Sequence, residues 1–162
     1  MGPITFPRIS GMLCLPLLLA GGFITQAYAA DVSVDAILVG PASPSPSTLC
    51  TLKARLKNGG ARTVSYFGFR VEIDGQDTPL YKMQTYVMDI DAGKTGEVEL
   101  YNFYSPPAPK PFTVRVTLVE AQWVQVKRDG TSTVTTPLGP VAGLPTSYSL
   151  TVRMSGSAHP TS

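Results

Sequence analysis

The chain has 162 residues, with 13 Lys or Arg, 11 Asp or Glu and one His, so its net charge is +2. This balance argues against a nucleic-acid-binding protein, because such proteins need a concentrated basic surface to displace counterions from phosphates. The single His159 lies near the C-terminus, where a frayed tail cannot hold a general base, and with so few His and Cys a zinc site is not expected either.

Residues 1–29 have the three-part layout of a secretory signal peptide. Arg8 precedes an apolar run from Ile9 to Ile24, and the small-residue triplet Ala27-Tyr28-Ala29 follows. We predict cleavage after Ala29 and export to the periplasm or the cell surface. The alternative is an uncleaved membrane anchor, since the apolar stretch approaches the roughly 20 residues of a spanning helix. Pro16 and the cleavage triplet favour the signal peptide.

The mature chain is expected to form one domain over residues 30–154, followed by a flexible tail over 155–162. Its first strand is predicted over 31–39, with Val32, Val34, Ala36 and Leu38 on one face. Residues 41–47 contain alternating Pro and Ser and should break the strand.

A second strand is predicted over 48–57, because apolar and polar residues alternate strictly there. Cys50 lies on the apolar side, which favours a small buried hydrophobe. An intermolecular disulfide or a lipid attachment at Cys50 is the alternative.

Turn dipeptides flank the third predicted strand, which spans 63–74 with Phe67, Phe69, Val71 and Ile73 facing inward. Asn58-Gly59-Gly60 precedes this strand and Asp74-Gly75 ends it. Both are typical of tight turns, since Asn and Gly adopt positive φ at little cost.

Residues 81–90 form a less regular predicted strand, and 97–104 alternate again after a turn at 91–96. The loop 105–111 contains four prolines and should be extended and stiff. The clearest strand is 112–120, a hairpin is predicted from 123–127 and 131–136, and a last strand contains Tyr148, Leu150, Val152 and Met154.

These elements predict an all-β protein: a single immunoglobulin-like antiparallel β-sandwich of about seven to nine strands. A small closed barrel is the alternative. The core is expected to contain the residues that alternate inward, namely Cys50, Leu52, Phe69, Val71, Val114 and Val116.

Several of these motifs together resemble CARDB, a bacterial cell-adhesion-related module of immunoglobulin-like fold. The resemblance covers about residues 31–120. It rests on the opening strand Asp31–Val34, the Asn58-Gly59-Gly60 and Asp74-Gly75 turns, the Asp91–Val98 turn-strand and the strand Phe112–Val116. It implies a sandwich used for adhesion or assembly and supplies no catalytic residue.

The best candidate site is a partner-binding patch where aromatic residues run into the proline-rich loop. Interfaces are commonly anchored by exposed aromatic groups, and prolines lower the entropy cost of docking. Alternation places Tyr101 and Phe103 on the face opposite Val98 and Leu100. The predicted site residues are Tyr101, Phe103, Tyr104, Pro106, Pro107 and Pro109.

We therefore expect a non-enzymatic exported module without cofactor. It would be an adhesion-type domain or an accessory subunit that docks on another protein or a multi-subunit assembly at the extracytoplasmic face. The alternative is a carbohydrate-binding or glycan-processing domain, with Tyr81, Tyr86, Tyr101 and Tyr104 as stacking platforms and Asp89 or Asp91 as polar partners. Calcium binding at Asp89 and Asp91 is also left open, because hard cations take oxygen ligands.

Overall fold

The computed structural model describes residues 30–78 and 85–156. The predicted signal peptide lies outside the described residues, as do Tyr81, His159 and most of the predicted tail. Within the described residues, no helix has the length and apolar character that crossing a membrane requires.

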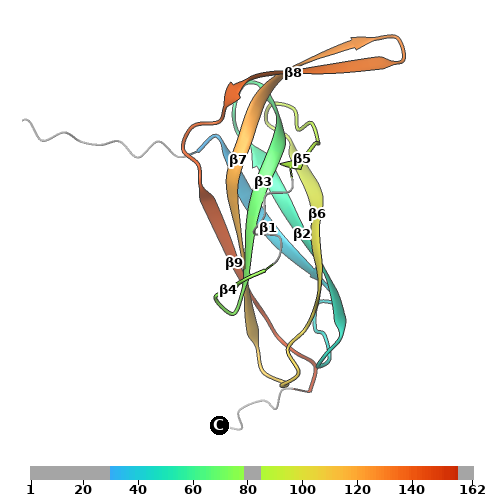
Figure 1. Ribbon diagram of the computed structural model, residues 1–162, viewed down its shortest axis with the longest axis vertical. Helices are drawn as coiled ribbons and strands as arrows, with labels where there is room; N and C mark the ends of the chain where they lie inside the picture. The colour runs from blue at the N-terminus through green and yellow to red at the C-terminus, as the bar shows by residue number, and fades with distance from the viewer. Residues whose placement is uncertain (1–29, 79–84, 157–162) are drawn as a thin grey trace, which may run out of the picture.

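The described chain forms two antiparallel sheets that pack face to face, which confirms the predicted β-sandwich (Figure 1). The smaller sheet has the order β1-β2-β6, and the larger one has the path β4-β3-β7-β8, with β5 beside β3 and β9 beside β7. The strands are β1 Val32–Gly40, β2 Leu49–Asn58, β3 Thr63–Ile73, β4 Gln76–Asp77, β5 Thr85–Tyr86, β6 Thr95–Tyr104, β7 Phe112–Asp129, β8 Ser132–Pro140 and β9 Thr146–Val152.

Strand β7 organises the larger sheet because it is much longer than its neighbours. One edge pairs with β3, from Val114 opposite Ile73 to Val124 opposite Thr63. The other edge pairs first with β9 and then with β8. The sequence predicted two separate strands at 112–120 and 123–127; this prediction was wrong, and the strand is continuous through Asp129.

Beyond Val124, no described strand pairs with β7 on its β3 side, and the β7–β8 hairpin projects from the sandwich as a two-stranded ribbon (Figure 1). Its loop is the two-residue Gly130-Thr131, and Gly130 has a φ of 55°, as type II′ hairpin turns require at their first central residue. The hairpin was predicted; its projection away from the core was not.

The core lies between the sheets and contains every residue that the sequence assigned to it: Cys50, Leu52, Phe69, Val71, Val114 and Val116 are all buried. Burial raises the pKa of the Cys50 thiol. This thiol therefore stays neutral and behaves as a small apolar side chain, as expected, rather than as a nucleophile.

A β-bulge in the edge strand β1 changes which face of the sheet the following residues point to. In β1, Val34 pairs with Leu56 and Ala36 with Arg55, so Asp35 is the extra residue. After this bulge Ile37 faces the core, whereas Leu38 faces outward and is exposed. The predicted inward phase of Ala36 and Leu38 was therefore wrong.

The two predicted turns have different structures. Asp74 and Gly75 have φ values of 48° and 77°, as expected for a hairpin turn, and they connect β3 to β4. The Asn58-Gly59-Gly60 segment crosses from one sheet to the other and is not a hairpin. Gly60 is needed because a Cβ there would overlap the ring of Trp123.

Asn58 holds this crossover together from a fully buried position. Its amide group donates hydrogen bonds to the carbonyls of Arg62 (2.7 Å) and Ile90 (2.9 Å), and its oxygen accepts one from the Gly60 N–H (3.0 Å). The side chain thus takes the place of backbone partners that the crossover lacks.

We expect Asn58→Ala to lower the free energy of unfolding by about 1–3 kcal/mol. The Arg62 carbonyl and the Gly60 N–H would lose the partner that Asn58 gives them, and the Ile90 carbonyl would keep only the Val64 N–H. Chemical denaturation measures this loss. Asn102→Ala is the matched control, since Asn102 is exposed on β6. Equal stabilities of the two variants would contradict the proposed role of Asn58.

Candidate docking surface at the proline-rich end

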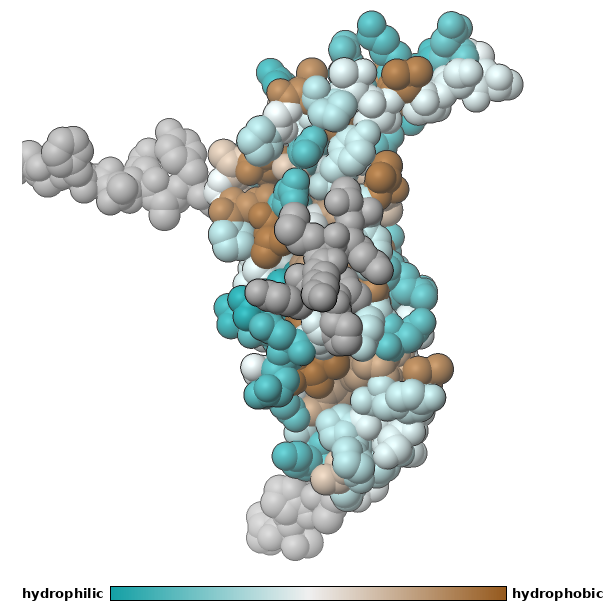
Figure 2. All heavy atoms as spheres, viewed as in Figure 1, coloured by the Kyte–Doolittle hydropathy of each residue, from teal (hydrophilic) through white to brown (hydrophobic). Residues whose placement is uncertain are grey.

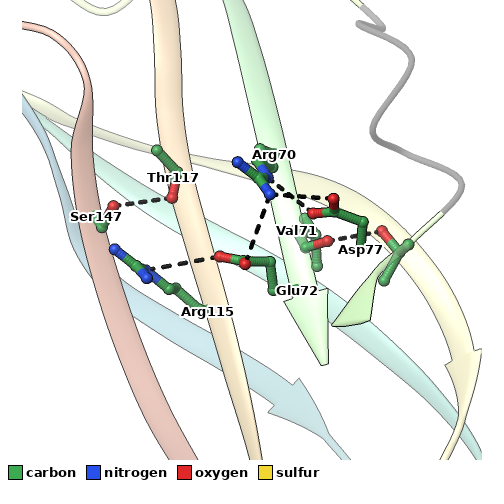
Figure 3. A network of polar contacts seen from close by, with 8 residues as sticks. Arg70, Val71, Glu72, Asp77, Arg115, Thr117 and Ser147 are labelled. Atoms are coloured by element: carbon green, nitrogen blue, oxygen red, sulfur yellow. Dashed lines mark hydrogen bonds and ion pairs between the residues drawn. The ribbon is translucent and has the colours of Figure 1, made fainter. Parts of the chain in front are cut away.

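The outer face of the larger sheet is polar, and its charges contact one another (Figure 3). Arg70 contacts Asp77 at 2.8 Å and Glu72 at 3.8 Å, and Arg115 contacts Glu72 at 3.7 Å. The hydroxyls of Thr117 and Ser147 hydrogen-bond beside this group. Such a hydrated, charge-paired face is a poor candidate for an apolar docking site.

The outer face of the smaller sheet is similar. Arg55 contacts Glu97 at 2.7 Å and Lys53 contacts Glu99 at 3.7 Å. The hydrogen bond from Arg55 to Glu97, together with the charge of that carboxylate, raises the pKa of the guanidinium. Apart from Val119 on the central strand β7, the large apolar side chains exposed among the described residues lie at the ends and edges of the sandwich.

One end of the molecule is built from two proline-rich loops, residues 41–47 and 105–111, which meet at the lower end of Figure 1. The hydroxyl of Ser105 donates to the Ser45 carbonyl (2.6 Å) and accepts from the Thr48 N–H (2.9 Å). The Ser47 N–H donates to the Pro106 carbonyl (3.3 Å). These bonds fix the loops to each other although they are far apart in the sequence.

The segment after β9 is attached to the same loops. The Ser155 N–H donates to the Pro44 carbonyl (3.0 Å), and the hydroxyls of Ser45 and Ser155 lie 2.9 Å apart. Three serines and a buried proline thus brace this end of the sandwich. Figure 2 shows pale side chains, of intermediate hydropathy, gathered there.

Two large side chains are exposed next to the loops. Tyr104 ends β6 with 71 % of its surface exposed, and Leu49 begins β2 with 55 % exposed. They occupy directly opposite positions on the paired strands, which brings their side chains together on the outer face. We call the loops 41–47 and 105–111 with Leu49 and Tyr104 the proline-rich end.

The structure contradicts the predicted exposure of Phe103. Its side chain is only 6 % exposed and packs edge-on against Phe112, with the ring centroids 5.9 Å apart. Tyr101 is half-buried and stacks on Phe103. Neither residue presents its ring on a separate outer face.

A β-bulge in β6 explains this error. Leu52 pairs with Tyr101 and Lys53 with Glu99, so Leu100 is the extra residue. The bulge shifts the alternation by one position: Val98 before it, Leu100 within it and Phe103 after it are all buried. Strict period two along the sequence cannot show such a shift.

The prolines of the predicted site lie where they were expected, at the surface. Pro106 is partly exposed, and Pro107 and Pro109 are exposed. The loop is not extended as predicted, because the Lys110 N–H donates to the Ala108 carbonyl (2.8 Å) in a turn around Pro109. The missed residue was Leu49, whose position out of phase with Cys50 and Leu52 could have indicated its exposure.

The residues of the carbohydrate alternative do not form one platform. The Tyr86 hydroxyl donates to the Leu100 carbonyl (2.8 Å), its ring packs edge-on against Phe69, and burial raises its pKa. Tyr101 packs on the core, and only Tyr104 is well exposed. Tyr81 lies outside the described residues.

Asp89 and Asp91 have separate partners rather than a shared one. Asp91 accepts a hydrogen bond from the Thr63 hydroxyl (3.0 Å), and Asp89 accepts one from the Thr135 hydroxyl (3.4 Å). No group of three or more His, Cys, Asp or Glu suited to a metal ion occurs in the described part of the chain.

Comparison with solved structures gives several matches. The chain is similar to a CARDB domain. This is the CARDB domain of the PF1109 protein of Pyrococcus furiosus in complex with di-metal ions, with 15% identity, a TM-score of 0.44, and coverage of 78% of this chain and 96% of that one. The solved structures that are similar to this chain thus include a member of CARDB, the family that the sequence resembles.

Two further matches have comparable scores. A domain of a cell surface protein of Methanosarcina acetivorans is 16% identical, with a TM-score of 0.42 and coverage of 70% of this chain and 94% of that one. The sporulation control protein Spo0M of Bacillus subtilis is 13% identical, with a TM-score of 0.43 and coverage of 80% and 51%. No protein-family model and no curated protein sequence matches the chain.

Proposed function

We propose that this protein is a non-enzymatic, exported β-sandwich module that docks through its proline-rich end onto another protein. The partner would belong to a larger assembly on the extracytoplasmic side of a membrane. The observation that carries the proposal is the exposed pair Leu49 and Tyr104, held beside two serine-braced loops. Export rests on the sequence of residues 1–29.

The composition of the proline-rich end favours a protein partner. Protein interfaces are enriched in aromatic residues and depleted of charge at their centre, and Lys110 is the only charged residue among the two loops, Leu49 and Tyr104. The hydrogen bonds of Ser45, Ser105 and Ser155 keep this surface in place before binding. Such preorganisation lowers the entropy cost of association.

Capture from native membranes and envelope tests the proposal. The Leu49→Ser, Tyr104→Ser double variant should lose the partner that the wild type recovers, because it loses both exposed apolar contacts. Both positions are exposed, so we expect stability to change by no more than about 0.5 kcal/mol per site.

Val134→Ser is the matched control. Val134 is 58 % exposed on β8, in the hairpin at the opposite end of the sandwich, and its replacement should leave capture unchanged. Equal recovery by the double variant and the wild type would contradict docking at the proline-rich end. Recovery of no protein, together with saturable glycan binding, would favour the carbohydrate alternative.

A further inference from the structure

Two edge strands of the sandwich pair with a described strand on one side only. Strand β1 pairs only with β2, and β9 pairs only with β7 in the described part of the chain. The two strands lie next to each other on the same side of the molecule (Figure 1). No backbone hydrogen bond joins β1 to β9 within the described residues.

A groove of about 390 Å³ runs between these edges. Its volume falls in the range of roughly 300–1,000 Å³ that is common for ligand sites. Apolar side chains line most of it: Ile37, Leu38 and Val39 from β1, and Leu150 and Val152 from β9. The bulge at Asp35 is what turns Leu38 outward, where it borders the groove.

An open strand edge with an apolar lining is suited to an extended peptide. Such a peptide can add to the edge through main-chain hydrogen bonds, while its alternate side chains enter the groove. A small molecule would leave most of the edge N–H and C=O groups unpaired. The chemistry of the groove therefore favours a strand over a compact ligand.

Arg153 supplies the one charge among the residues that line the groove. Arg55, Arg70 and Arg115 each contact a carboxylate, whereas Arg62 and Arg128, which are exposed away from the groove, make no ion pair with a described residue. Arg153 is exposed and makes no ion pair with any described residue. An acidic group on the occupant would complete this side of the groove, through a charge-assisted hydrogen bond.

The groove also reaches the proline-rich end, because Ala42 and Ser43 of the loop 41–47 form part of its lining. We propose that the groove between β1 and β9 binds an extended, largely apolar segment of the partner protein that carries Asp or Glu opposite Arg153. The inference rests on the proposed function only for the source of this segment, which is the same partner.

The proposal can be tested by phage display. A library of random nine-residue peptides is selected for binding to the exported protein. Peptides enriched on the wild type should alternate apolar residues and share Asp or Glu at one position. When the Arg153→Glu variant is the target, the selected peptides should instead carry Lys or Arg at that position. Enrichment of the same peptides on both proteins, or of none on the wild type, would overturn the proposal.

The strand geometry is tested with the best acidic peptide by fluorescence polarisation and hydrogen exchange. The affinity for the peptide should fall at least about tenfold for Arg153→Glu. It should remain unchanged for Arg128→Glu, because Arg128 is exposed on the distant hairpin.

N-methylation of alternate peptide nitrogens should abolish binding, and the bound peptide should protect the backbone amides of residues 37–39 and 150–153 from hydrogen exchange. Tight binding of the methylated peptide would overturn strand addition.

Docking at the proline-rich end and peptide binding in the groove can be contradicted independently of each other. The Leu49→Ser, Tyr104→Ser variant should still bind the selected peptide, because neither residue lines the groove. Loss of peptide binding in Arg153→Glu alone would support the groove whatever partner capture shows. Retained capture by the double variant would contradict the proline-rich end and leave the groove result unaffected.

Discussion

Replacing Val114 by Asp is expected to unfold the domain. Val114 is fully buried in the middle of the larger sheet, between Ile73 on β3 and Leu150 on β9. A carboxylate there would have no counter-charge, and the expected loss is about 4 kcal/mol or more. That loss is comparable with the whole stability of many domains, which is about 5–15 kcal/mol.

Circular dichroism and chemical denaturation measure this effect. Ser149→Asp is the control, because it adds the same charge at an exposed position of β9 opposite Arg115. It should leave the unfolding transition nearly unchanged. A cooperative transition of Val114→Asp within about 1 kcal/mol of the wild type would show that the strand faces the other way.

The second large effect is expected at Phe103. Phe103→Ala should lower the free energy of unfolding by about 3–5 kcal/mol, because it leaves a cavity against Phe112 and Tyr101. Tyr104→Ala, one residue further along the same strand, should change it by about 0.5 kcal/mol or less, since Tyr104 is exposed.

Denaturant titration of both variants separates the two roles. A loss of similar size at both positions would contradict the bulge at Leu100. The result also determines how partner binding can be tested. A variant that changes Phe103 confounds lost docking with lost folding, whereas Leu49 and Tyr104 change only the surface.

Local alternation was enough to predict much of this fold. Over residues 50–57 and 112–118 the apolar positions have a strict period of two, and Cys50, Leu52, Val114 and Val116 are buried as predicted. Asp74-Gly75 likewise forms the turn that its residue types favour. These features depend on neighbouring residues alone, through the pleat of a strand and the φ preferences of Asp and Gly.

The candidate site was predicted only in part. Tyr104 and the prolines are at the surface as expected, but Phe103 is buried and Leu49 was missed. Bulges at Asp35 and Leu100 reverse the facing of the residues that follow them. A bulge is set by how two paired strands match in length and twist, which one strand's pattern does not reveal.

The sequence by itself determined most of the strands, the six core residues predicted above and the Asp74-Gly75 and Arg128–Gly130 turns, because each follows from short-range periodicity and backbone preference. The predicted strand 81–90 was wrong: in its described part only Thr85–Tyr86 is a strand. Only the tertiary structure decided that Asn58-Gly59-Gly60 crosses between sheets, and that loops 41–47 and 105–111 join into one end. It also placed the open edges of β1 and β9 around a groove. These arrangements depend on contacts between segments far apart in the chain, and their energies arise only once the sheets pack.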